Sequence, residues 1–171
     1  MALSGKVCTF ARMNMTKKRL LFVCLGNICR SPAAEGIMKH LVEAEGLEEE
    51  FFIDSAGIGS WHVGQLPDPR MRKHGLWHGY HFDSRARQIR RKDFDRFDYI
   101  IVMDNENLYD VSRLARNDED KKKIVKLADY LRHHPQQKTI PDPYYGGDSD
   151  FELVIELLED ALAELLRSVE R

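Results

Sequence analysis

The sequence has few cysteines and no long apolar segment. Three cysteines in 171 residues are too few for the disulfide framework of a small secreted domain, which indicates a reducing compartment. No apolar run approaches the ~20 residues needed to cross a bilayer, and the first residues lack the basic-then-apolar layout of a secretory signal. We therefore expect a cytoplasmic protein with no membrane partner.

Neither sign of charge is in excess. The sequence has 26 lysines and arginines against 28 acidic residues, for a formal net charge of −2 at pH 7. This balance gives no overall attraction to nucleic acid or to an anionic membrane. The basic stretch 85–92 contains no aromatic residue on which a base could stack, so we interpret it as a solvated face and expect no nucleic-acid partner. The histidines, His62 and His74 among them, show no zinc-like spacing with carboxylates, so we interpret them as surface residues and predict no metal and no cofactor.

Apolar runs and periodicity predict one domain in which strands alternate with helices. The length allows one sizeable core, and residues 1–18 show no regular periodicity, so we expect a flexible tail at 1–18 and a single domain at 19–171. Buried strands are predicted at 20–23, 51–53, 99–103 and 124–127. Helices are predicted at 32–44 with Ser31 as N-cap, after Pro69 up to Gly79, at 105–115 and at 151–169. In the last of these, seven apolar residues recur at three- and four-residue steps and predict one apolar stripe that lies on the sheet: Phe151, Val154, Ile155, Leu158, Leu162, Leu165 and Val169. The prediction is an α/β fold with a doubly wound, four-stranded parallel sheet and helices on both faces.

The segment between the first strand and the first helix predicts an anion site. It reads Cys-Leu-Gly-Asn-Ile-Cys-Arg-Ser at 24–31. Free backbone N–H groups and the helix dipole converge where a tight loop enters a helix, and both favour a bound phosphate. Gly26 and Asn27 tolerate the left-handed backbone that turns successive N–H groups inward. The planar guanidinium of Arg30 is suited to gripping two phosphate oxygens at once.

Cys24 is the candidate nucleophile at this anion site. Helix N-termini and neighbouring cations lower a thiol pKa from ~8.5 to between ~3.5 and ~7.5, so we expect Cys24 to be largely thiolate at neutral pH. A thiolate beside a bound phosphate is placed to attack phosphorus. A lone cysteine is more often a small buried apolar residue, but this loop reverses that expectation.

Three motifs together resemble the low-molecular-weight protein tyrosine phosphatases. They are the Cys-x5-Arg-Ser loop after the first strand, Asp-Ser-Ala-Gly at 54–57 and Asp-Pro-Tyr-Tyr-Gly at 142–146. The likeness extends from about Arg19 to the C-terminus. It implies an enzyme that hydrolyses phosphotyrosine in proteins through a phosphocysteine intermediate, without a metal. Its partners would be tyrosine-phosphorylated proteins, and we expect a monomer or weak dimer.

The resemblance implies a role for each matching residue. Cys24 would attack phosphorus, Asp142 would protonate the leaving phenol and then activate water, and Arg30 would hold the phosphate with the loop amides. Those amides belong to Leu25, Gly26, Asn27, Ile28, Cys29 and Arg30. An acid is needed because a phenol of pKa ~10 leaves poorly as phenolate.

Further residues would support the loop and the substrate. By the same resemblance, Ser31 would donate a hydrogen bond to the Cys24 sulfur, and Asn27 and Ser55 would brace the loop. Several family members have a histidine where this sequence has Ser84, which we expect to replace it only weakly.

Other candidate residues come from outside the loop. Asp104 ends the third predicted strand, and the ligand crevice of a doubly wound sheet lies at strand carboxyl ends, so Asp104 is predicted beside Arg30. Trp61 either packs within its own loop or, with Tyr144, forms the aromatic walls that sandwich a phenyl ring, and we favour the walls.

Some residues keep two interpretations. Cys29 either packs in the core or, as the resemblance suggests, forms a reversible disulfide with Cys24 that protects the nucleophile from over-oxidation. Tyr144 and Tyr145 are phosphorylated in some relatives, or are simply exposed loop tyrosines here. Cys8, in the tail, is assigned no role.

Three other functions compete with the phosphotyrosine phosphatase. An arsenate reductase of the same fold needs further cysteines downstream, and none follows Cys29. A protein-arginine phosphatase carries threonine where this sequence has Ile28, and an apolar side chain suits an aromatic ring better than a guanidinium. A non-catalytic phosphotyrosine-binding module would not need the complete set of Cys24, Arg30 and Asp142. The sequence does not identify the physiological substrate.

Overall fold

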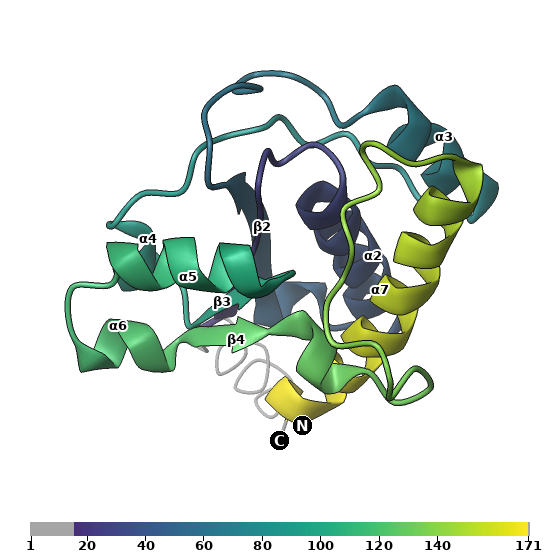
Figure 1. The fold of residues 1–171 in the computed structure, drawn as a ribbon. Coiled ribbons are helices and arrows are strands. Elements are labelled where there is room, and N and C mark those ends of the chain that lie inside the picture. Colours follow the sequence, from purple (N-terminus) through teal and green to yellow (C-terminus); the bar gives the residue numbers. More distant parts are fainter. Residues whose placement is uncertain (1–15, 171) are drawn as a thin grey trace, which may run out of the picture.

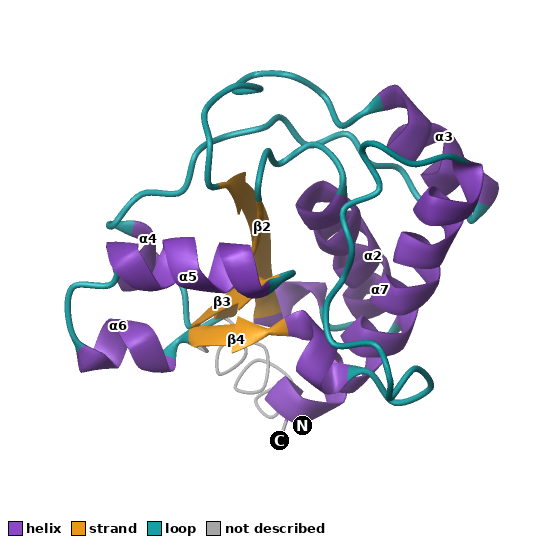
Figure 2. Ribbon diagram, viewed as in Figure 1, coloured by secondary structure: helices purple, strands orange, loops and turns teal. Residues whose placement is uncertain are grey.

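The computed structural model describes residues 16–170. Most of the predicted tail, including Cys8, lies outside these residues. Four parallel strands form one sheet in the order β2-β1-β3-β4. Figure 2 labels three of these strands, β2, β3 and β4. They are β1 (Lys18–Cys24), β2 (Phe51–Gly57), β3 (Tyr99–Val102) and β4 (Ile124–Lys126). The predicted doubly wound α/β fold with a four-stranded parallel sheet is therefore confirmed, although β1 begins one residue before the predicted domain boundary.

Helices cover both faces of the sheet (Figure 1). The α-helices are α2 (Arg30–Ala44), α3 (Pro69–Trp77), α4 (Asp93–Arg96), α5 (Asn105–Leu114), α6 (Asp118–Lys122) and α7 (Asp148–Glu170), with 3-10 turns at η1 (Glu48–Glu50) and η2 (Leu127–Tyr130). The four predicted helices are present. The sequence did not predict α4, α6 or the 3-10 turns, because segments of three to five residues are too short to show a helical period.

Strand β1 separates two hydrophobic cores. Leu20 and Phe22 point to one face and pack in a cluster with residues of α2 and α7. Leu21 and Val23 point to the other face and pack with residues such as Phe94 of α4. Successive side chains of a strand point to opposite faces, so a continuous apolar run is what a strand covered on both sides requires.

The long C-terminal helix α7 packs its predicted apolar stripe into the core cluster that contains Leu20 and Phe22 of β1. All seven predicted stripe residues are buried: Phe151, Val154, Ile155, Leu158, Leu162, Leu165 and Val169. The helix begins at Asp148, three residues before the stripe, and the carboxylate of Asp150 accepts a hydrogen bond from the Gly147 N–H (2.8 Å) at this end. No helix among residues 16–170 is long and apolar enough to span a bilayer.

The predicted N-cap of the first helix is wrong. Helix α2 begins at Arg30, Cys29 occupies the N-cap position, and no side chain caps the helix. The hydroxyl of Ser31 lies instead 2.7 Å from Asn27 Nδ2 and 3.0 Å from Cys24 Sγ. The Ser31 hydroxyl is therefore engaged by residues of the loop in front of the helix and does not cap the helix.

Candidate active site

The loop between β1 and α2 is a ring of backbone donors at a helix N-terminus. None of the N–H groups of residues 25–29 donates a hydrogen bond to another described residue. The left-handed conformation that turns the loop falls on Asn27, with φ of 58°, and not on Gly26 as well. Gly26 matters for its size, because a Cβ there would lie 3.1 Å from the His62 ring. Unpartnered N–H groups together with the helix dipole make this loop suited to an anion.

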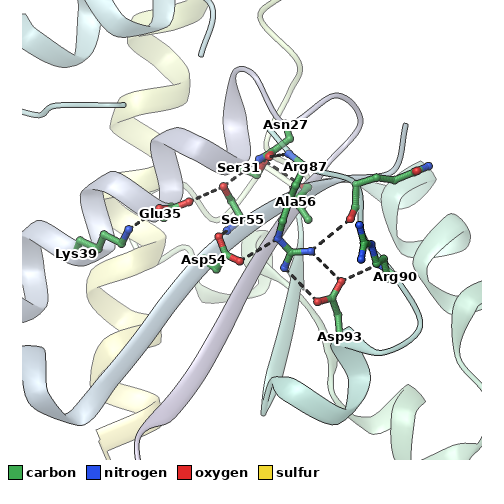
Figure 3. A network of polar contacts seen from close by, with 11 residues as sticks. Asn27, Ser31, Glu35, Lys39, Asp54, Ser55, Ala56, Arg87, Arg90 and Asp93 are labelled. Atoms are coloured by element: carbon green, nitrogen blue, oxygen red, sulfur yellow. Dashed lines mark hydrogen bonds and ion pairs between the residues drawn. The ribbon is translucent and has the colours of Figure 1, made fainter. Parts of the chain in front are cut away.

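The side chain of Asn27 points away from the ring and holds the loop in shape. Its Nδ2 donates to Ser31 Oγ (2.7 Å) and to Ser55 Oγ (3.0 Å), and its Oδ1 accepts from the Arg87 backbone N–H (3.0 Å). Figure 3 shows this network from close by. The buried amide thus makes contacts to α2, β2 and the segment after α3 at once, which fixes an unfavourable backbone angle.

The network continues into charged residues that the sequence did not predict. Ser55 Oγ donates to buried Glu35 Oε1 (2.6 Å), and Lys39 Nζ lies 2.5 Å from Glu35 Oε2. The Arg87 guanidinium bonds the carboxylates of Asp54 and Asp93 (Figure 3). The one available signal was Glu35, which lies among the apolar residues of the helix predicted at 32–44. A buried carboxylate there needs polar partners, so its position indicates a network.

Ser84 does not take part in this network. No hydrogen bond joins it to Asn27 among the described residues, and the Arg87 N–H supplies the donor to Asn27 Oδ1 instead. The expected replacement of a histidine by Ser84 is therefore not seen.

Arg30 lies buried at the end of the loop with one nitrogen unused. Its Nη1 donates to Asp104 Oδ2 (2.6 Å) and to the Ile140 carbonyl (3.0 Å), while its Nε is buried and has no partner among the described residues. Burial acts to lower the pKa of Arg30, but the neighbouring charges of Cys24 and Asp104 outweigh it and raise that pKa, so the guanidinium stays charged.

Asp104 is fixed by the helix that follows it. It is the N-cap of α5, and its Oδ1 accepts from the Asn107 N–H (2.8 Å) while Oδ2 holds Arg30. The predicted position of Asp104 beside Arg30 is therefore what the structure has. Strands β1 and β3 are the neighbours at which the winding of the sheet reverses, so Cys24 and Asp104 meet at the switch point of a doubly wound fold.

Cys24 and Asp142 face the same opening from different parts of the chain. Cys24 ends β1, and its Sγ lies 3.0 Å from Ser31 Oγ, whose lone pair already accepts from Asn27. The hydroxyl proton of Ser31 then has two acceptors within reach, the Cys24 sulfur at 3.0 Å and the Ala56 carbonyl at 3.4 Å. Asp142 Oδ2 lies 3.6 Å from Arg30 Nη2, and Asp142 Oδ1 accepts from the Tyr144 N–H (3.1 Å). The Asp142 side chain is 37% exposed, so it reaches both the opening and solvent.

These residues surround one cavity of about 370 Å³. Its lining comprises Cys24, Leu25, Gly26, Ile28, Cys29, Arg30, Trp61, His62, Asp142, Tyr144 and Tyr145. Trp61 and Tyr144 belong to it, as the interpretation of aromatic walls requires, and both rings are exposed. The Trp61 ring lies so close to Gly59 that a Cβ there would clash at 1.9 Å. His62, interpreted from the sequence as an ordinary surface histidine, lines the cavity instead.

Comparison with known proteins identifies the family. The model of the low molecular weight phosphotyrosine protein phosphatases matches residues 19–171. The chain belongs to this family. A putative low molecular weight protein-tyrosine-phosphatase from Synechocystis is 45% identical over 151 residues, which cover 88% of this chain and 96% of that protein.

Solved structures of similar proteins have the same fold. A crystal structure of protein tyrosine phosphatase from Entamoeba histolytica with Hepes in the active site matches with a TM-score of 0.87 and 46% identity, covering 90% of this chain and 97% of that one. The crystal structure of DARP, the Drosophila arginine phosphatase, matches with a TM-score of 0.82 and 35% identity, covering 89% and 98%. The predicted family is therefore confirmed.

The second cysteine of this phosphatase loop differs in character from the first. Cys29 is buried, and burial raises the pKa of its thiol well above the ordinary value, with a further contribution from the charge of Asp68. It therefore remains a protonated thiol. Cys24 and Cys29 line the same cavity and are both free, so the reversible disulfide stays a prediction.

Proposed function

We propose that this member of the family hydrolyses phosphotyrosine in proteins, with Cys24 as nucleophile, Arg30 and the loop amides as the phosphate site, and Asp142 as general acid. The strongest support is the set of donors without a partner among the described residues in the loop that helps to line the cavity, namely the N–H groups of 25–29 and the buried Arg30 Nε. A buried donor without a partner is costly unless a ligand satisfies it. A phosphoryl group seated on these donors lies over Cys24.

The first step transfers the phosphoryl group to sulfur. The Cys24 thiolate attacks phosphorus, an S–P bond forms, and the P–O bond to the tyrosine ring breaks. Asp142 gives its proton to the departing oxygen, so the product leaves as phenol and the carboxyl becomes a carboxylate. Arg30 and the amides hold the oxygens on which charge concentrates, without a metal ion. Asp104 Oδ2 accepts a hydrogen bond from Arg30 and keeps the guanidinium in place during this step.

The second step releases phosphate. Water attacks the phosphorus of the phosphocysteine, Asp142 takes a proton from that water, and the S–P bond breaks to return the Cys24 thiolate. Ser31 donates a hydrogen bond to the sulfur and so stabilises it as the leaving thiolate. Inorganic phosphate then dissociates, and Asp142 is protonated again for the next cycle.

The cavity supports an aromatic substrate. Trp61 and Tyr144 supply ring faces at the rim, and Ile28 adds an apolar side chain to the lining. A phenyl ring gains from such contacts, whereas a guanidinium would leave its N–H groups facing apolar atoms. We propose that this difference makes phosphotyrosine, and not phosphoarginine, the substrate.

The remaining properties follow from the sequence. We infer that the enzyme works in the cytoplasm as a monomer or weak dimer, and that the phosphatase domain begins with β1, so that the proposed tail ends before Lys18. The near-balanced charge supports the absence of nucleic-acid and membrane partners. No cofactor enters either chemical step.

A substrate panel tests the proposal. Phosphotyrosine, phosphoserine and phosphoarginine peptides are compared with arsenate in metal-chelating buffer. We expect hydrolysis of phosphotyrosine to exceed that of the other peptides by at least ~100-fold in kcat/KM, and no arsenate reduction. The Cys24→Ser variant controls for contaminating phosphatase: it should lose turnover yet still bind inorganic phosphate, because its amides and Arg30 are intact. Preference for phosphoarginine, or turnover by Cys24→Ser, would contradict the proposal.

A further inference from the structure

A buried histidine outside the cavity bridges two carboxylates. His74 lies on α3 and is fully buried, so its interpretation as a surface histidine is wrong. Its Nδ1 is 2.6 Å from Glu152 Oε1 and its Nε2 is 3.0 Å from Asp148 Oδ1, both on α7. A neutral imidazole carries one N–H and can donate at only one nitrogen, whereas the imidazolium donates at both. The geometry therefore fits a charged His74 that ties α3 to the first turn of α7, beside which α3 lies in Figure 1.

The ring of His74 has little freedom to move. It stacks on Phe151 at 5.7 Å with an interplanar angle of 13°, and it meets the edge of Trp77 at 4.6 Å. Phe151 is itself buried in the main core. The bridge is thus anchored to a rigid part of the molecule.

Other charged groups meet the same two carboxylates. Lys73 of α3 has its Nζ 3.8 Å from Asp148 Oδ1, and His78, the residue that follows α3, has its Nε2 2.5 Å from Glu152 Oε2. Hydrogen bonding to His74 is the largest cause that lowers the pKa of Asp148 and of Glu152, so both carboxylates stay ionised. Lys73 is half-exposed and His78 is partly exposed, whereas His74 is fully buried.

The bridge stands at one end of the segment that carries Asp142. Asp148 follows Asp142 by six residues. At the other end of α3, Arg70 Nη2 donates to the Tyr144 carbonyl at 3.0 Å, and the Arg70 guanidinium packs over the Phe151 ring. Arg70 and His74 are one helical turn apart, so a single face of α3 holds the chain at Tyr144 and again at Asp148.

We propose that His74 is a positioning residue for the general acid. By fixing where α7 begins, it fixes the path of the short segment 143–147 and with it the Asp142 carboxyl at the mouth of the cavity. This proposal rests on the role of Asp142 proposed above. A displacement of an acid by about 1 Å is enough to cost on the order of 100-fold in rate, so a remote anchor has a measurable effect.

The test compares His74→Gln with two further variants. Asp148→Asn removes the charge of one partner of the bridge at an exposed position, so it is expected to fold even if His74→Gln does not. Tyr80→Phe is the matched control, because the Tyr80 hydroxyl donates to Glu159 (2.7 Å) and so also joins the region after α3 to α7, but away from its first turn. Thermal unfolding of each variant reports the loss of stability separately.

The expected signature is specific to the acid. The measured quantity is kcat/KM, which reports the phosphoryl transfer and not the later hydrolysis that is common to both substrates. For a phosphotyrosine peptide, His74→Gln should lower kcat/KM about 10-fold and Asp148→Asn about 3-fold. For an aryl phosphate whose phenol is acidic enough to leave unaided, the kcat/KM of both variants should stay within about twofold of the wild type. Tyr80→Phe should keep its kcat/KM on both substrates. Equal loss on both substrates, or no loss in either bridge variant, would overturn the proposal.

Two measurements separate this proposal from the proposed function. In the Asp142→Ala background, His74→Gln should cause no further loss of kcat/KM on phosphotyrosine, because the effects of residues that act through one group are not additive. A further loss as large as that in the wild-type background would overturn the proposal. Proton–nitrogen NMR at pH 5.5 should show two ring N–H protons for His74, protected from exchange by the two carboxylates, and one or none would overturn the bridge. A wild type inactive on phosphotyrosine would instead refute the proposed function, while the NMR result still stands.

Discussion

Replacing Asn27 tests how the loop keeps its shape. Asn27→Ala removes three hydrogen bonds, to Ser31, to Ser55 and from the Arg87 N–H. Each is worth ~0.5–1.5 kcal/mol, and alanine at φ of 58° adds ~1–2 kcal/mol. We therefore expect a loss of about 2.5–6.5 kcal/mol in the free energy of unfolding, which is a large share of a typical ~5–15 kcal/mol.

Asn27→Gly separates the two contributions. Glycine adopts the left-handed region without steric cost but makes none of the three hydrogen bonds. It should therefore be more stable than the alanine variant by ~1 kcal/mol and still less stable than the wild type.

Urea unfolding followed by circular dichroism measures these differences, and phosphate binding shows whether the loop survives. We expect both variants to bind phosphate more weakly than the wild type. An alanine variant as stable as the wild type would refute the assignment of Asn27 as the residue that holds the loop. Equal stability of the two variants would show that the left-handed angle costs alanine no more than the extra backbone entropy that glycine loses on folding.

Further predictions concern the chemistry of the cavity. Arg30→Lys should lower kcat/KM by at least ~100-fold, because an ammonium cannot bind Asp104 and the phosphate in the same plane, and near-normal steady-state kinetics would make Arg30 structural. The pH profile of kcat/KM should be bell-shaped with an optimum at roughly pH 5–6.5, and Asp142→Ala should flatten its alkaline limb, as initial rates across pH will show. Mild peroxide, as the oxidant, should inactivate the enzyme reversibly through a Cys24–Cys29 disulfide, and Cys29→Ser should make the lost activity harder to recover with thiols. If mass spectrometry finds no Cys24–Cys29 link, Cys29 is only a packed core residue.

The fold and the centre of the site could be predicted from the sequence because both depend on local patterns. A continuous apolar run at Leu20–Val23 and the stripe of α7 have few alternatives to burial. The position of Asp104 followed from the rule that strand carboxyl ends meet at one edge, and the structure has it 2.6 Å from Arg30.

Features that depend on long-range contacts escaped prediction. Ser31 looks like an N-cap in sequence, but Asn27 and Cys24 engage its hydroxyl across the loop. Glu35 gains its role only when β2 brings Ser55 to it, and His62 reaches the cavity because Gly26 leaves room for its ring. The bridge of His74 to α7 joins residues more than seventy positions apart, and no local pattern encodes such a pair.

The most direct test of the central claim is to trap the phosphoenzyme. Enzyme mixed with a phosphotyrosine peptide is quenched within the first turnover, digested at neutral to alkaline pH to preserve an S–P bond, and analysed by mass spectrometry. We predict phosphate on the peptide that contains Cys24, in greater yield for Asp142→Ala because that variant lacks the base for hydrolysis. Phosphate on any other residue, or turnover with no phosphocysteine at any quench time in either protein, would contradict the account.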